Sequence, residues 1–245
     1  MLIGVAAVLA VVIAVLPASL VTHWLPRPVR AADFSGSLWH GSAGTISVNG
    51  HEAGAIEWRL HPGALLRLTV SADLHWVKVG FVIDAAVKID RHGFSAKDIK
   101  GSGPVSDLHD LGVAAGWRGR ADIDIRELRG NFTRLLAAAG DVKVSNLASA
   151  QIADGADLGS YDLALAPDAV ATDGSVSARL NDAGGPLEVQ AVIHYSATQR
   201  TGVLSGTLKE RPGASPALRN ELDNLAQLRG RDPQGRIPAE LEFSF

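Results

Sequence analysis

The sequence predicts a mainly β protein, with a single N-terminal transmembrane helix, a large antiparallel and curled sheet, and a few short helices. Three observations predict this fold class. No charged side chain occurs before Arg27, whereas charges are spread through every later segment. After residue 40, apolar and polar residues alternate with a period of two, which is typical of strands with one buried and one solvated face. Residues that favour turns separate these alternating segments.

The first element is the apolar run 2–21, which consists of Leu, Ile, Val and Ala with one Gly, one Pro and one Ser. A helix of this length spans roughly 30 Å, the thickness of the hydrocarbon core of a bilayer. Trp24 lies where an interfacial aromatic residue is expected, and Pro26 and Pro28 end the helix. We therefore assign residues 1–26 to a membrane anchor and residues 27–245 to one β-rich domain.

A cleaved signal peptide is the alternative interpretation of this run. Residues 17–19 and 29–31 are the candidate cleavage sites, but the first lies inside the apolar run and the second contains the branched Val29. The run is longer than a signal core of roughly 7–15 residues, and basic residues are missing before it. These observations favour an uncleaved anchor. Arg27 and Arg30 follow the span and weakly favour a cytoplasmic domain, although long domains cross membranes regardless of such charges.

The β-rich domain is predicted from alternation and turns. The turn signals are Asn49-Gly50 and residues 91–93, 173–174 and 182–185. One long helix is expected over 216–229, because Ser215 can cap it, a leucine stripe has helical spacing and Gly230 can end it. Residues 232–235 fit a type I turn, and shorter helices are predicted over 104–115 and 132–139. The alternating segments are 56–60, 66–76, 122–126, 161–165, 176–180, 187–195 and 240–245.

The predicted sheet has more apolar surface than these few helices can cover. It must therefore fold over on itself as a sandwich or curl into a partly closed barrel. In the second case the apolar face becomes a trough that could hold an acyl chain or an apolar strand of a partner.

Composition excludes several classes of function. The chain has no cysteine, which excludes disulfides and thiol catalysis, and its net charge of −3 argues against a nucleic-acid partner. The eight histidines lack the spacing of metal ligands, and His61, His75 and His194 are expected on solvated strand faces.

Motifs of known chemistry are also missing. The sequence contains no nucleophile elbow, P-loop or dinucleotide-binding glycine motif, and residues 101–104 are interpreted as a turn. Asp122 and Asp124 share a strand face, but the neighbouring Arg120 and Arg126 indicate a solvated ladder of ion pairs. We therefore predict no catalytic, cofactor-binding or metal-binding residue, no cofactor and no enzymatic activity.

Four segments resemble the type II secretion system protein N family (general secretion pathway protein N). They are the anchor followed by Gly36-Ser37-Leu38-Trp39-His40-Gly41-Ser42-Ala43; Ile56 to Pro62 leading to Leu65-Leu66; Gly185-Pro186-Leu187 with the strands that end at Leu204 to Lys209; and the helix 216–229 followed by Asp232 to Pro238. Their order and spacing carry the resemblance, and residues 80–180 contribute little to it.

The resemblance implies a single-pass protein of the cell inner membrane with its domain in the periplasm. It implies a non-enzymatic accessory or scaffold component of type II protein secretion, with the secretin and the inner-membrane platform proteins as partners. The alternative is a periplasmic lipid-binding or lipid-transport module whose curled β groove holds lipid.

Overall fold

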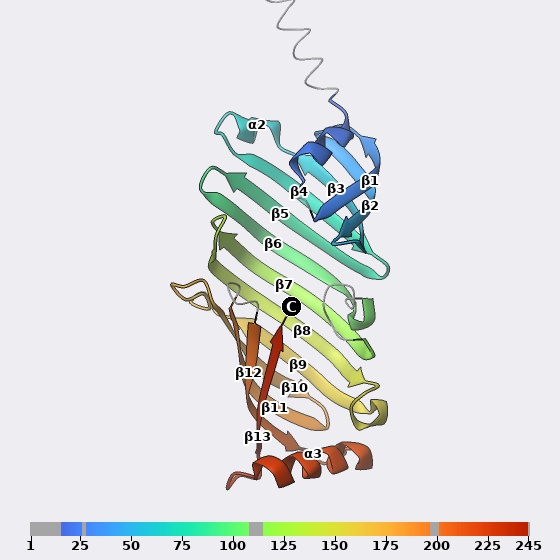
Figure 1. The fold of residues 1–245 in the computed structure, drawn as a ribbon, viewed down its shortest axis with the longest axis vertical. Coiled ribbons are helices and arrows are strands. Elements are labelled where there is room, and N and C mark those ends of the chain that lie inside the picture. Colours follow the sequence, from blue (N-terminus) through green and yellow to red (C-terminus); the bar gives the residue numbers. More distant parts are fainter. Residues whose placement is uncertain (1–15, 26–27, 108–114, 197–200, 245) are drawn as a thin grey trace, which may run out of the picture.

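Every strand of the domain pairs with the strand that follows it in the sequence. The computed structural model describes residues 16–25, 28–107, 115–196 and 201–244. Thirteen strands form one antiparallel sheet in the order β1 to β13 (Figure 1). The strands are β1 Val29–Gly36, β2 His40–Val48, β3 His51–Leu60, β4 Val70–Lys78, β5 Phe81–Asp90, β6 Gly93–Pro104, β7 Trp117–Gly130, β8 Leu135–Ser149, β9 Asp157–Leu165, β10 Val176–Gly184, β11 Leu187–Ser196, β12 Thr201–Glu210 and β13 Ile237–Ser244.

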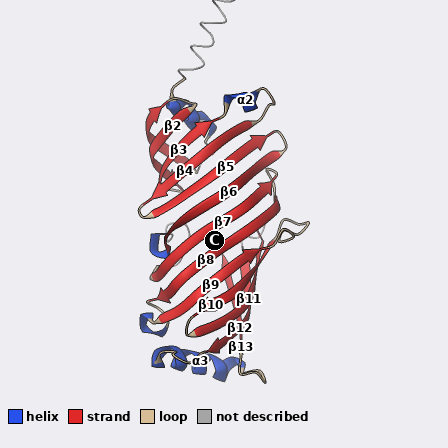
Figure 2. Ribbon diagram, turned by 180° about the vertical axis from the view of Figure 1, so that it is seen from behind, coloured by secondary structure: helices blue, strands red, loops and turns tan. Residues whose placement is uncertain are grey.

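The single antiparallel sheet confirms the mainly β prediction. The sheet is open, however, which corrects the expectation of a sandwich or a partly closed barrel. Strands β1 and β13 are the two edges of a single sheet, so the domain is neither a two-sheet sandwich nor a closed barrel. The strands run obliquely across a long curved surface, and both ends of the sheet turn away from its middle (Figures 1 and 2). Twist of roughly 20–25° between neighbouring strands accumulates over so many strands and produces such coiling without edge pairing.

Short helices cover the apolar face at the ends of the sheet. Helix α3, Pro216–Arg229, lies at the C-terminal end, and its leucines pack against Val189 and Ile237. Its predicted caps are confirmed, because the Leu218 N–H donates to Ser215 Oγ at 3.1 Å and Gly230 follows with a φ of 79°. The 3-10 helix η1, Ala18–Trp24, lies at the N-terminal end.

The turns largely follow the sequence prediction. Asn49 and Gly50 have φ values of 53° and 87° in the two-residue connection of β2 and β3, a geometry that asparagine and glycine tolerate best. The Asp232 carbonyl oxygen accepts the Gly235 N–H at 2.9 Å in the predicted turn after α3. The segment 101–104 is different, since it belongs to strand β6 and not to a turn.

Three other predicted elements differ from the structure in whole or in part. The strand expected over 66–76 begins only at Val70, because residues 62–65 form the short helix α2, Pro62–Leu65. The helix expected over 132–139 is mostly strand β8. In the helix expected over 104–115, residues 105–107 form a 3-10 turn and residues 108–114 lie outside the described part of the chain.

The predicted anchor falls mainly outside the described residues, which omit residues 1–15 and 26. Its last part packs against the sheet, since Ala18 is 2 % exposed and lies in a cluster with Ala43 and Trp58. Within the described chain, no helix has both the length and the apolar composition that a membrane crossing requires.

Candidate functional site

The two faces of the sheet differ in chemistry from one edge to the other. One row of directly paired residues crosses all thirteen strands and contains only apolar side chains and glycine. In order, it is Phe34, Ala43, Ile56, Trp76, Ile83, Gly101, Ile123, Val142, Leu163, Leu180, Ala191, Gly206 and Ala239.

The neighbouring row faces the other side of the sheet and is polar or charged apart from Ala164 and Val192. Within it, His75 Nδ1 lies 2.7 Å from Asp84 Oδ1 across β4 and β5. Because successive side chains of a strand point to opposite faces, these two rows make the sheet amphipathic along its whole length. The row is Ser35, Ser42, Glu57, His75, Asp84, Lys100, Asp124, Asp141, Ala164, Arg179, Val192, Ser205 and Glu240.

Glycines in the apolar row and beside it make room for large neighbours. A Cβ atom on Gly101 would lie 2.7 Å from Ile83 Cγ1, and one on Gly103 would lie 2.4 Å from Phe81 Cδ2. Both distances are shorter than real carbon contacts, so a side chain at either position would displace the opposite residue. This explains why the segment 101–104 is rich in glycine although it forms no turn.

A cavity of about 600 Å³ opens on the apolar face at the N-terminal end. Residues of η1 and of strands β1 to β5 line it, together with Leu65 of α2. The polar residues among the described lining are His61 and Ser71. A cavity of this volume with apolar walls falls within the range of ligand-binding pockets.

Trp58 forms part of the wall of this cavity and is held from three sides. Its Nε1–H donates to the Leu38 carbonyl at 2.9 Å, and the ring of Phe34 meets it edge-on with centroids 6.4 Å apart. Gly41 is paired with it across β2 and β3, and a Cβ atom there would lie 2.6 Å from Trp58 Cζ2. The wall is therefore preformed. Trp39 also lines this cavity.

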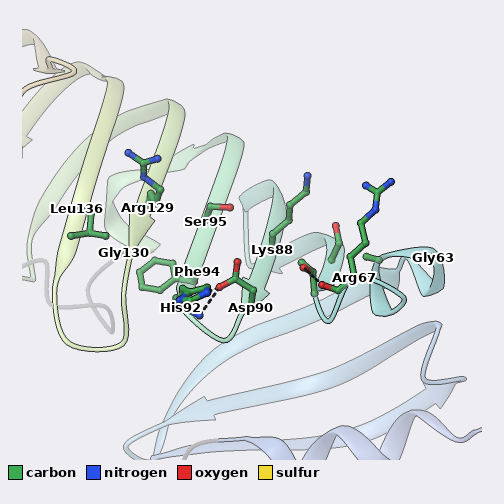
Figure 3. Close-up of a pocket in the computed structure, with 14 residues that line it drawn as sticks. Gly63, Arg67, Lys88, Asp90, His92, Phe94, Ser95, Arg129, Gly130 and Leu136 are labelled. Carbon is green, nitrogen blue, oxygen red and sulfur yellow. Dashed lines mark hydrogen bonds between the residues drawn. The ribbon is translucent and has the colours of Figure 1, made fainter.

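A second hollow, of about 650 Å³, lies beside this cavity and is basic. Lys88 and Arg129 share a row with Ser95 on the polar face, and Arg67 approaches from the loop after α2 (Figure 3). Asp90 belongs to the same hollow, but its Oδ1 accepts the backbone N–H groups of His92 and Gly93 at 2.7 and 3.1 Å. Ser71 lines both hollows.

Several described ionisable groups form isolated pairs, whereas Asp182, Glu188, Arg211 and Arg236 form a connected network of ion pairs. Within that part of the chain, no group of three or more His, Asp or Glu side chains could hold a metal ion. His61 Nε2 lies 3.0 Å from Asp73 Oδ2, and His194 Nδ1 lies 2.8 Å from Ser177 Oγ.

The predicted ladder of ion pairs on β7 forms only in part. Arg120 Nε lies 3.5 Å from Asp122 Oδ1, but Arg126 pairs with Asp141 on the next strand at 3.9 Å. Asp124 instead faces Lys100 across β6 and β7.

One buried hydroxyl was not singled out from the sequence. The Tyr161 hydroxyl donates to the Leu158 carbonyl at 2.6 Å, and it also lies 3.3 Å from the Leu187 carbonyl. Burial raises the pKa of Tyr161 above its ordinary value, and nearby Asp182 and Asp157 add to this shift. The hydroxyl is thus kept neutral and serves to join β9 to β11. Its position in an ordinary alternating segment gave no sequence signal.

The comparisons with known proteins agree with the resemblance described above. Residues 27–239 match the protein family described as type II secretion system (T2SS), protein N. The match includes strands β1 to β12, helix α3 and the start of β13. No curated protein and no solved structure matches the chain.

Proposed function

Because the chain belongs to the type II secretion system protein N family, we propose that it is a non-enzymatic scaffold component of this machinery, tethered to the inner membrane with its sheet in the periplasm. In this role it links the inner-membrane platform proteins with the outer-membrane secretin. The observation that carries the proposal is the family match, which covers the sheet nearly from edge to edge.

The open sheet offers a physical route to partner binding. Strands β1 and β13 each have one side without a neighbouring strand of the described sheet. An unpaired strand edge can bind an extended segment of another protein through main-chain hydrogen bonds. Two such edges on one rigid sheet could bind one partner each, which suits a linking role.

The packing of the N-terminal residues supports a tether that is not cleaved. Both candidate signal-peptidase sites lie in elements packed into the domain, since Ala18 belongs to η1 and Ala31 pairs with Ile46 in the sheet. Cleavage at either position would remove or fray part of the wall of the N-terminal cavity. We therefore keep the proposed inner-membrane anchor, with Arg27 and Arg30 on the periplasmic side.

Binding of isolated partner domains tests this proposal. The full chain in detergent should capture the periplasmic domains of the secretin from the same organism, and it should crosslink to platform proteins in membranes. Failure of both experiments, with a folded chain, would contradict the linking role.

A second candidate function, lipid binding or lipid transport, is favoured by a specific observation. The apolar row crosses all thirteen strands, and it begins at a preformed apolar cavity of about 600 Å³. Mass spectrometry of lipid extracted from the purified chain tests this candidate. Stoichiometric acyl chains would support it, whereas a lipid-free preparation that still binds secretin would favour the scaffold alone.

A further inference from the structure

The end of α2 and the loop that follows it expose three leucines to solvent. Residues 65–68, here called the leucine loop, have the sequence Leu-Leu-Arg-Leu. Leu66 is 91 % exposed and Leu68 is 80 % exposed, and Leu65 is partly exposed at 44 %. The alternation of the sequence predicted that Leu66 and Leu68 would face the sheet interior, but β4 begins only at Val70. A cluster of exposed large apolar side chains marks an interaction surface.

The leucine loop is a defined structure that displays these side chains. The Arg67 N–H donates to the Ala64 carbonyl and the Leu68 N–H to the Leu65 carbonyl, each at 2.9 Å. The Thr69 N–H also donates to the Ala64 carbonyl, at 3.2 Å. Leu68 has a φ of 54°, a left-handed conformation that is unfavourable for a leucine. The backbone thus holds Leu66 and Leu68 outward and does not turn them toward the core.

The loop stands at the end of the molecule where the N-terminal segment enters. Helix α2 and η1 lie at the same end of the long axis in both views (Figures 1 and 2). Leu65 lines the apolar cavity together with Val70 and Ile89, which are each 43 % exposed. The exposed leucines therefore continue the apolar wall of the cavity to its outside.

Positive charge accompanies this apolar surface. Arg67 lies inside the loop, and Lys88 and Arg129 line the basic hollow beside it. Within the described residues, none of these three cations belongs to an ion pair, whereas Arg120, Arg126, Arg211, Arg231 and Arg236 do. Apolar side chains flanked by unpaired cations fit the boundary between acyl chains and anionic headgroups of a lipid leaflet.

We propose that the leucine loop inserts Leu66 and Leu68 into a leaflet that contains anionic phospholipid, with Arg67 and Lys88 at the level of the headgroups. The choice of the inner membrane as this bilayer rests on the proposed function, but the insertion itself does not. Insertion places the mouth of the apolar cavity against the acyl chains. It also fixes the tilt of the sheet relative to the membrane, which a single tether would leave free.

The absence of cysteine from the chain permits a direct test with single labels. An environment-sensitive fluorophore on Leu66→Cys of the full chain is measured in vesicles of phosphatidylethanolamine and phosphatidylglycerol that carry a quencher on the acyl chains. The control is Leu228→Cys, because Leu228 is 85 % exposed but lies on α3 at the opposite end of the molecule. We expect several times more quenching at position 66 than at position 228. Equal quenching at both positions would overturn the proposal.

Two further arms separate the parts of the proposal. Adding Leu68→Asp should reduce quenching at position 66 toward that of the control, while thermal unfolding stays unchanged because Leu68 is exposed. Vesicles of phosphatidylcholine alone should quench position 66 less, and equal quenching would refute the role of the cations.

A label on Val11→Cys reports the tether independently. Quenching at 11 without quenching at 66 refutes the loop and keeps the tether, and the reverse result refutes the tether and keeps the loop.

Discussion

Two leucines of helix α3 offer a matched test of how the C-terminal end of the sheet is covered. Leu218 is 2 % exposed and packs in a cluster with Ala214 and Leu222, whereas Leu228 on the same helix is 85 % exposed. Both lie in α3, Pro216–Arg229, so Leu→Ala changes helix propensity little in either case. Any difference in stability between the two variants therefore measures burial against the sheet.

The expected magnitudes follow from this difference in exposure. Leu218→Ala removes the buried side chain and leaves a cavity, which costs about 3 kcal/mol for a leucine in a packed core. For a chain of this size, that corresponds to a fall in Tm of about 6–12 °C. Leu228→Ala should change the free energy of unfolding by less than about 0.5 kcal/mol.

Urea denaturation followed by circular dichroism measures both variants against the unsubstituted chain. We expect a lower midpoint for Leu218→Ala at an unchanged slope, which indicates a change in stability and not in compactness. Equal midpoints for the two variants would refute the assignment of α3 as the cover of this end of the sheet.

Three other changes have defined outcomes. Gly103→Val should lower the free energy of unfolding by about 1–3 kcal/mol because its Cβ would overlap Phe81, whereas Gly63→Ala, which meets no atom within 4 Å, should be neutral in the same thermal melts. Ser215→Ala should cost about 1 kcal/mol through loss of the N-cap of α3, and unchanged stability in urea would show that the cap is dispensable. The Asp173 carboxyl accepts hydrogen bonds from the side chain and the backbone of Ser175, which lower its pKa below the usual value. This turn is therefore stabilised at pH values above the usual pKa, and it loses that stabilisation as pH falls through the lowered pKa. A resonance of the Asp173 carboxyl that titrates at the usual pH would contradict this.

Alternating side chains predicted seven of the thirteen strands, and helix α3 was predicted because its N-cap, its leucine stripe and its terminal glycine agree with one another. The strand prediction failed where the same alternation continues through a loop, at Leu66 and Leu68. Periodicity records which residues are apolar, but it does not show that the chain has left the sheet. The exposed leucines became visible only in three dimensions.

The helix predicted over 132–139 is wrong for a different reason. Its alanines favour a helix, but Ala138 faces Leu128 and Gly140 faces Ile125 across β7 and β8. A Cβ atom at position 140 would lie 2.5 Å from Ile125 Cα, so these positions must be small for the strands to pair. Pairing with the preceding strand β7 thus overrides local helix propensity, which a single sequence cannot reveal.

The candidate site was predicted in character but not in place. One of the two arrangements predicted for the sheet, a curled sheet whose apolar face forms a trough, anticipated an apolar groove. The position of the cavity depends on η1, on Gly41 beneath Trp58 and on Leu65 of α2, which are distant in sequence. The basic hollow combines Arg67, Lys88 and Arg129 from three separate segments, and no sequence motif joins them.

Deletion of the gene, followed by assay of secreted enzymes, tests the proposed role in secretion most directly. The account predicts that these enzymes accumulate between the two membranes and that the full chain restores their export. Unchanged export, together with an altered lipid composition of the outer membrane, would contradict the secretion role and favour lipid transport.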